Sequence, residues 1–279
     1  MKRIRIGDTG SPLTNGRLAR AALAIPEMLV ELEEAEYNFG TTPCYPGHKA
    51  RAVGIGDWLK VHLFNSGFTF SSIACCWELD SNVFANLTVE SRVGLGQQSQ
   101  VIGHHGKYAK PNSVDDLDHV HVIAHSFGPY WWAEPGAGNV ARIQDSWIEA
   151  GRVGLMCSCG NGPDGQRMDG IGSKFEIDFE KSPSAGGDIG NRPVGIWCRS
   201  GTTRIFDVDV DVRGSKDCTL AAGLAMIPGD WPGATLKEFP YDWPFVDTLD
   251  FRAKIEPNGT PVFGEIIHQM GTLNGKRVA

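Results

Sequence analysis

The 279-residue chain lacks any apolar run near the ~20 residues that a membrane-spanning helix needs. It also lacks an excess of basic charge, with a formal net charge of −7 at pH 7. Phosphate groups are bound by basic surfaces, so this charge argues against nucleic acid or an anionic membrane as a partner. The basic start, MKRIRIGDTG, is not followed by the apolar core of a signal peptide. We therefore expect a protein that is not secreted through a signal peptide.

The motifs of several common enzyme classes are missing as well. The chain has no G-x-x-x-x-G-K-[ST], no G-x-S-x-G and no H-E-x-x-H. Its seven cysteines are odd in number and irregularly spaced, which indicates reduced thiols rather than a disulfide framework. No cofactor is expected from these patterns, and the function has to be argued from the arrangement of strands.

The segment 14–36 has a helix-rich composition. Thr14 or Asn15 can cap a first helix, and Pro26 either breaks it or starts a second. After Gly40 the sequence predicts short strands of alternating polar and apolar residues, bounded by Gly, Pro, Asn and Asp. The fold class we expect is therefore all-β with an N-terminal helical cap.

A repeated motif indicates that the chain is built from stacked repeats. SRVGLG at 91–96 and GRVGLM at 151–156 both follow an alternating segment that starts with Asn-Val. Similar alternating segments occupy 119–128, 174–182, 204–215 and 249–259. The glycines that end the repeat unit would be Gly94, Gly128, Gly154, Gly195 and Gly223. Their spacings fall within the range of about 20–50 residues that is typical of stacked repeats. If so, Val153 and Leu155 face one interior stack with Ile196 and Leu224.

Three architectures remain open: a β-propeller, a β-sandwich and a parallel β-helix. Short strands and uneven spacing favour the β-helix. The Asn82-Val83 and Asn139-Val140 starts, the NLTVES strand end and the helix before the first coil resemble the pectate-lyase-like superfamily. The resemblance implies a right-handed parallel β-helix of roughly six coils over residues 55–260. Residues 1–54 would then form the extension and cap, and residues 261–279 a tail or assembly segment.

That superfamily includes polysaccharide lyases, glycoside hydrolases, and bacteriophage spikes and decorating proteins. Its enzymes usually carry a signal peptide, which is not visible here. The resemblance therefore implies a virion surface protein, made in the host cytoplasm, that binds surface polysaccharide or other virion proteins. The alternative is a glycosidase or polysaccharide lyase. Stacked coils have open ends, so we expect a homo-oligomer, a trimer by analogy with phage spikes.

Carboxylates gather on one face of the expected stack. The candidate catalytic residues are Asp145, Asp178, Asp209 and Asp211. Strands ~4.8 Å apart bring such carboxylates within the ~5–9.5 Å that glycoside hydrolysis uses, although any acidic face would do the same. The expected register aligns Asn86, His121, Asp145, Glu176, Asp209 and Arg252 in one outward column. Residues 139–151 fit it least well, because Gln144 and Ser146 would face inward, and a bulge there would change the alignment.

Three histidines, His119, His121 and His125, share parity on the 119–128 strand, opposite Val120 and Val122. A His-x-His pair on a strand can chelate a divalent transition metal, and Asp116 or Asp118 could complete the site. The other interpretation is an ordinary polar face with neutral imidazoles.

Aromatic residues supply a third feature. The loop expected at 127–138 carries Tyr130, Trp131 and Trp132, and Trp147 would face outward on the next strand. Such rings offer flat platforms for sugars and anchor protein interfaces. Alternatively, the loop packs one or both tryptophans against the coil.

Overall fold

The structure is a computed structural model. It describes residues 2–7, 10–23, 28–32, 37–38, 51–54, 59–65, 83–93, 103–105, 114–124, 128–133, 140–159, 167–181, 191–227, 244–269 and 271–278. These residues are mostly in strands, and α1 (Pro12–Leu23) is the only α-helix among them. The predicted all-β class is confirmed.

Two sheets contain all the strands of the described residues. The larger sheet contains β1 (Lys2–Ile6), β2 (Met28–Leu32), β3 (Tyr37–Asn38), β4 (Arg51–Gly54), β5 (Leu59–Asn65), β6 (Val83–Val93), β8 (Val114–Ala124), β10 (Val140–Gln144), β11 (Trp147–Ala150), β13 (Arg167–Ile171), β14 (Lys174–Asp178), β16 (Thr202–Arg213), β18 (Phe245–Glu256), β20 (Gly271–Leu273) and β21 (Lys276–Val278). The smaller sheet contains β7 (Gly103–His105), β9 (Tyr130–Ala133), β12 (Val153–Cys159), β15 (Val194–Cys198), β17 (Ala221–Met226) and β19 (Phe263–His268). A 3-10 turn, Phe179–Lys181, follows β14.

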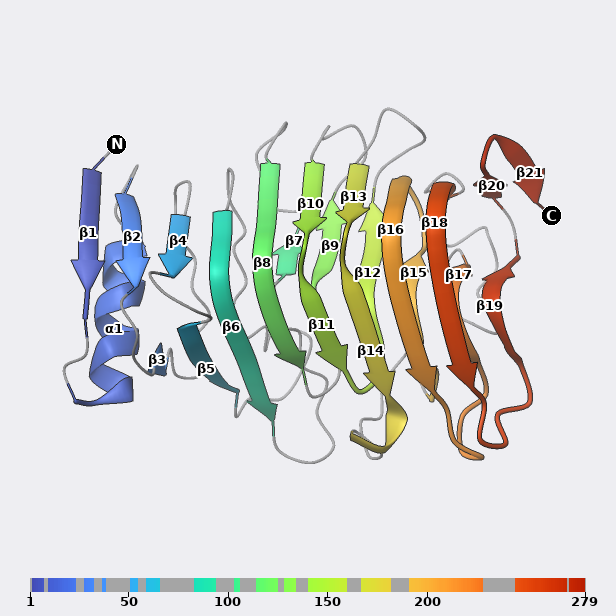
Figure 1. Cartoon of the computed structure of the whole chain (residues 1–279), viewed down its shortest axis with the longest axis horizontal. Coiled ribbons are helices and arrows are strands. Elements are labelled where there is room, and N and C mark those ends of the chain that lie inside the picture. Colours follow the sequence, from blue (N-terminus) through green and yellow to red (C-terminus); the bar gives the residue numbers. More distant parts are fainter. Residues whose placement is uncertain are drawn as a thin grey trace.

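Neighbouring strands run parallel in both sheets, except in the terminal β20–β21 hairpin. The strands of the larger sheet follow one another along the long axis, and most of the smaller sheet lies behind them (Figure 1). From β12 onward the chain alternates between the sheets, passing through β13 and β14 to β15, and through β16 to β17. Each passage adds one strand, or one broken strand, to each sheet.

The core fills the space between the sheets with stacked side chains. Strands β11 and β14 alternate exposed or half-buried residues with buried ones, as the sequence predicts. Their register aligns Ile148 with Phe175, and Phe175 with Val210, and all three side chains are buried. Burial of such a side chain contributes about 1.5–3 kcal/mol, so each added pair of strands extends the same stabilising stack.

A bend divides the long strands of the larger sheet in two. His119, Asp145, Gly172, Asp207 and Asp250 have φ values between 44° and 58° and occupy equivalent positions in successive strands. This left-handed conformation suits Gly and is tolerated by Asp. Position 172 needs glycine for a second reason, since a Cβ there would lie 2.4 Å from Asp145 Oδ1. The departure from alternation considered for residues 139–151 is a left-handed bend at Asp145, which the neighbouring strands share.

Buried serines hold the bend together. Ser146 faces inward, as expected, and is 3% exposed, whereas Gln144 is half-buried. Val120 N donates to Ser146 Oγ at 3.0 Å, and Ser146 N donates to Ser173 Oγ at 3.2 Å. The two hydroxyl oxygens thus accept hydrogen bonds from backbone N–H groups that the bend turns away from the neighbouring strand.

The repeated glycines form a column. Gly128, Gly154, Gly195 and Gly223 occupy equivalent positions in the smaller sheet, while Gly94 lies outside the described residues. A Cβ on Gly154 would lie 2.6 Å from Gly195 O and 2.8 Å from Ile177 Cδ1. The stacking of the motif is as expected, but one detail is wrong. Leu155, Ile196 and Leu224 join the main core, whereas Val153 packs in a second cluster with Trp197 and Leu220.

The N-terminal prediction was partly wrong. Helix α1 begins at Pro12 and ends at Leu23, so Thr14 and Asn15 lie inside it. The expected second helix is instead β2, because residues 28–32 pair with β1 on one side and β4 on the other. These pairs satisfy the backbone while Val30 is buried. Within the described part of the chain, no helix has the length and apolar character required to cross a membrane.

Strands on both sides of the expected domain boundaries belong to the same sheets. Strands β1, β2 and β4 precede residue 55 and share the larger sheet with β6. Beyond residue 260, β19 pairs with β17, and β20 pairs with β18. The division into cap, coil region and tail stays a prediction.

Candidate functional site

The outer surface of the larger sheet beyond the bend carries five of the eleven predicted site residues: His121, Trp147, Asp178, Asp209 and Asp211. We call it the charged face. It comprises His121, Trp147, Glu149, Lys174, Glu176, Asp178, Asp209, Asp211, Arg213, Arg252, Lys254 and Glu256. These side chains come from β8, β11, β14, β16 and β18. They alternate with buried residues on β16 and with partly buried residues on β18.

The expected register on this face was wrong by two residues in places. Lys174, not Glu176, pairs with Asp209, and His121 pairs with Trp147 and Thr88 rather than with Asp145 and Asn86. Asp145 lies at the bend, beside His119 and Gly172. Alternation assigns each residue to a face but does not fix the offset between strands, because a shift by two residues keeps every side chain on the same face.

Arginine and lysine side chains lie between the carboxylates of the charged face. Arg252 bonds to Asp207 Oδ1 at 2.7 Å and to Asp209 Oδ1 at 2.6 Å. Arg213 bonds to Asp178 Oδ2 at 3.2 Å and to Glu256 Oε2 at 3.3 Å. Lys254 pairs with Glu256, and Lys174 with Glu176. Most of these side chains are half exposed, so solvent weakens the ion pairs. The pairs orient the charged side chains more than they stabilise the fold.

These contacts govern the ionisation of the carboxylates. Hydrogen bonding from Arg252 lowers the pKa of Asp209 below its usual value. Hydrogen bonds from Lys254 and Arg213 lower the pKa of Glu256 in the same way. Carboxylates held ionised at neutral pH accept protons poorly and have none to donate, so Asp209 does not suit a general acid role.

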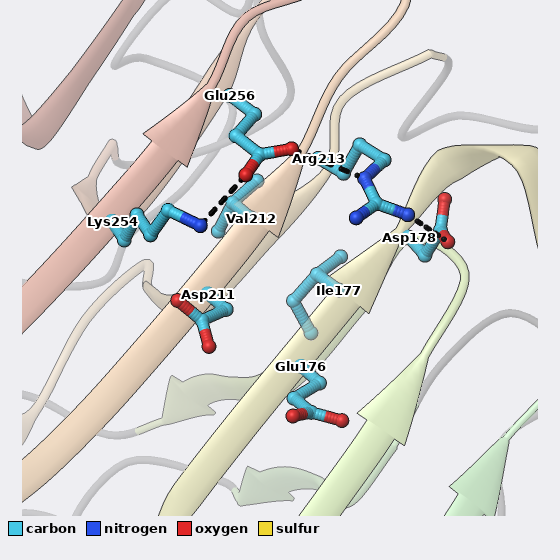
Figure 2. Close-up of a pocket in the computed structure, with 8 residues that line it drawn as sticks. All are labelled: Glu176, Ile177, Asp178, Asp211, Val212, Arg213, Lys254 and Glu256. Atoms are coloured by element: carbon cyan, nitrogen blue, oxygen red, sulfur yellow. Dashed lines mark hydrogen bonds and ion pairs between the residues drawn. The ribbon is translucent and has the colours of Figure 1, made fainter.

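A groove of ≈ 350 Å³ crosses the end of the charged face. Figure 2 shows its walls, with Glu176 and Asp211 on adjacent strands and Arg213 between Asp178 and Glu256. A neighbouring hollow of ≈ 340 Å³ is lined by Lys174, Asp209, Arg252 and others. Asp211 and Lys254 line both hollows, which makes Asp211 the predicted catalytic residue most centrally placed.

An aromatic platform lies beside these hollows. The rings of His121 and Trp147 are stacked, with centroids 4.0 Å apart and an interplanar angle of 3°. Trp147 is 37% exposed. His121 Nε2 lies 2.8 Å from Glu149 Oε1, and Lys174 Nζ lies 5.9 Å from the centroid of the Trp147 ring. His121 therefore covers one face of the indole, and charged groups of Glu149 and Lys174 lie near the two rings.

The expected loop at Tyr130, Trp131 and Trp132 was wrong. These residues form β9, which pairs with β12 and β7 in the smaller sheet. Parallel partners on both sides satisfy the backbone of this segment. The positions of their side chains lie outside what the structure describes, so their glycan-binding role stays a prediction.

The three predicted metal ligands do not form one described cluster. His119 and His121 lie on the outer side of β8 opposite buried Val120 and Val122, as expected, but the bend gives them different neighbours. His121 contacts Glu149, whereas His119 Nδ1 lies 2.7 Å from Asp118 Oδ1. His125 lies outside the described residues.

Sequence reasoning missed the cations as partners of the carboxylates. A signal was present, because Asp209, Asp211 and Arg213 face Arg252, Lys254 and Glu256 with opposite charge at each of the three positions. Opposite charges on neighbouring strands stabilise a register.

Comparison with protein-family models, curated proteins and solved structures finds no match for the chain.

Proposed function

We propose that the chain is a right-handed parallel β-helix on the surface of a bacteriophage particle, a spike or capsid-decorating protein that binds host glycans. The alternation between two parallel sheets and the stacked glycines support this fold. Stacked coils provide a long rigid surface on which side chains from many strands act together.

The observation that carries the proposed function is the His121–Trp147 platform. An exposed ring that is already stacked on a second ring loses little side-chain freedom when a ligand covers it. Sugar rings have an apolar face that packs on indole and hydroxyl groups that bond to charged side chains. The adjoining hollows supply such groups from Lys174, Asp211 and Lys254.

The test is a panel of bacterial capsules and lipopolysaccharides, scored for binding and for cleavage. Trp147→Ala is expected to weaken binding of the recognised glycan at least tenfold, the equivalent of about 1.4 kcal/mol. Phe263→Ala is the matched control, because Phe263 is also an exposed aromatic residue, 56% exposed, but lies on the smaller sheet. Equal binding by the wild type and Trp147→Ala would refute this assignment.

A polysaccharide-degrading activity is the second candidate. Glu176 and Asp211 are register partners on adjacent strands and both line the groove. Their strands are ~4.8 Å apart, which suits a pair of carboxylates acting on one glycosidic bond. If the chain degrades polysaccharide in this way, Asp211→Asn is expected to abolish depolymerisation while glycan binding at Trp147 persists. A panel without any cleavage would remove the enzyme hypothesis and leave binding intact.

The proposal includes an oligomer, because the apolar residues at the end of the last coil are only partly covered. The inward residues Phe251, Ala253 and Ile266 are only partly buried, whereas their neighbours Val208, Val210 and Leu224 in the preceding coil are buried. Strand β20 covers only Phe245 and Val246 of β18. A second copy of the chain would bury this apolar end. Light scattering that finds a stable monomer at all working concentrations contradicts the oligomer.

A further inference from the structure

Three side chains with metal-ligating atoms meet at the bend between β8 and β10. One ligand atom from each of Asp118, His119 and Asp145 lies within 4.8 Å of the other two. His119 and Asp145 are exposed and Asp118 is half-buried, so the cluster opens to solvent. Its composition is mixed, an imidazole with two carboxylates, and it differs from the set of three histidines that the sequence suggests.

The backbone fixes this arrangement before any ligand binds. His119 and Asp145 both have left-handed φ values, 51° and 44°, at equivalent positions on adjacent strands. Asp145 N donates to Ile171 O at 2.9 Å, which ties the bend to the following strand. The missing side chain of Gly172 leaves room for the Asp145 carboxylate itself, since a Cβ there would lie 2.4 Å from Asp145 Oδ1. Ligands held by rigid elements bind a metal with a smaller loss of conformational freedom.

We propose that Asp118, His119 and Asp145 bind a divalent transition metal, with Zn²⁺ as the representative ion. Atoms at about 2.0–2.2 Å from one Zn²⁺ are about 3–4 Å apart, so small side-chain rotations bring the three ligands into place. One imidazole nitrogen with carboxylate oxygens suits Zn²⁺, whereas Ca²⁺ requires six to eight oxygen ligands. Water completes the coordination on the open side. This inference does not depend on glycan binding.

The test is a Zn²⁺ titration of tag-free, chelator-treated protein by isothermal calorimetry, with Ca²⁺ in parallel. Asp145→Asn and His119→Gln are each expected to weaken the site at least tenfold, since each removes a direct ligand. Asn retains the left-handed backbone at 145, so this variant keeps the bend. Zinc bound by other histidines appears equally in every curve, and the difference between the wild type and the variants is the readout.

Asp207→Asn is the matched control, because Asp207 occupies the equivalent bend position but pairs with Arg252. It is expected to bind Zn²⁺ as the wild type does. Wild-type binding no tighter than about 1 mM would overturn the site. So would unchanged binding by a folded Asp145→Asn, or loss on His121→Gln instead of His119→Gln. Stabilisation by Zn²⁺ in thermal melts, absent in Asp145→Asn, is the second expected result.

Discussion

His121 and Trp147, from neighbouring strands of the charged face, lie ring on ring with 3° between their planes. The contact links two neighbouring strands on the outer surface of the larger sheet. Such aromatic pairs contribute about 0.5–1.5 kcal/mol beyond the burial of their area. His121→Ala is therefore expected to lower the free energy of unfolding by about that amount, measured in urea. His121→Phe keeps a ring under Trp147 and should retain more of the stability. Equal losses in both variants would contradict a stacking contribution.

Leu155 is fully buried and stacks on Ile196, which stacks on Leu224. Leu155→Ala is expected to cost about 2–5 kcal/mol, because neighbours held in the strands above and below cannot collapse into the cavity. Glu265→Gln, an exposed change in the same sheet, should stay within about 0.5 kcal/mol of the wild type. Urea melts of both variants check this, and similar midpoints would argue against the stacked core.

Gly154 is expected to be nearly irreplaceable. A Cβ there would lie within 3 Å of Gly195 O and of the Ile177 and Phe175 side chains, so Gly154→Ala forces the sheets apart. Overpacking of this kind costs about 1–3 kcal/mol or more. At Gly264 the nearest atoms to an added Cβ are 3.6 Å away, and Gly264→Ala should be tolerated. Thermal melts that rank the two variants in the opposite order would refute the argument.

Cys198 should be inert in the folded protein. Its side chain is fully buried, and desolvation raises the pKa of its thiol to about 12. The thiolate is the reactive form, so alkylation at pH 8 is expected to spare Cys198 until urea unfolds the chain. Peptide mass spectrometry of iodoacetamide-treated protein measures this. Rapid labelling of Cys198 under native conditions would show that the core opens there.

The Asp209–Arg252 pair predicts a dependence of stability on pH. Because Arg252 lowers the pKa of Asp209 below its ordinary value of 3.8, the folded state favours the carboxylate. The stabilisation is therefore present above pH 3.8 and is lost as the pH falls through the lower, folded-state pKa. The wild type should exceed Asp209→Asn in urea midpoint at pH 7, and the gap should close in acid. Both side chains are half exposed, so the gap is small and shrinks in high salt.

Except at the bend and at Val153, the sequence alone determined which residues face inward, and it identified the glycines that stack. Alternation has a period of two residues, so Ile148 and Phe175 could be placed in the core without knowledge of their neighbours. The repeated motif likewise identified Gly154 and Gly195 as one column, because a backbone that passes this closely excludes any Cβ.

Only the tertiary structure decided the offset between neighbouring strands. Alternation assigns a face but not a partner, because a shift by two residues keeps every side chain on the same face. A left-handed residue also bends successive strands at one equivalent position. His, Asp and Gly all occupy that position, so no single residue type marks it in the sequence. The bend gives His119 and His121 different neighbours, and the register places His119 beside Asp145, which follows the neighbouring strand β10. The alternation of charged and apolar residues predicted that one face of the sheet carries charged side chains. Which of these side chains form ion pairs, and which meet at the bend, depends on the strand register, and packing determines that register.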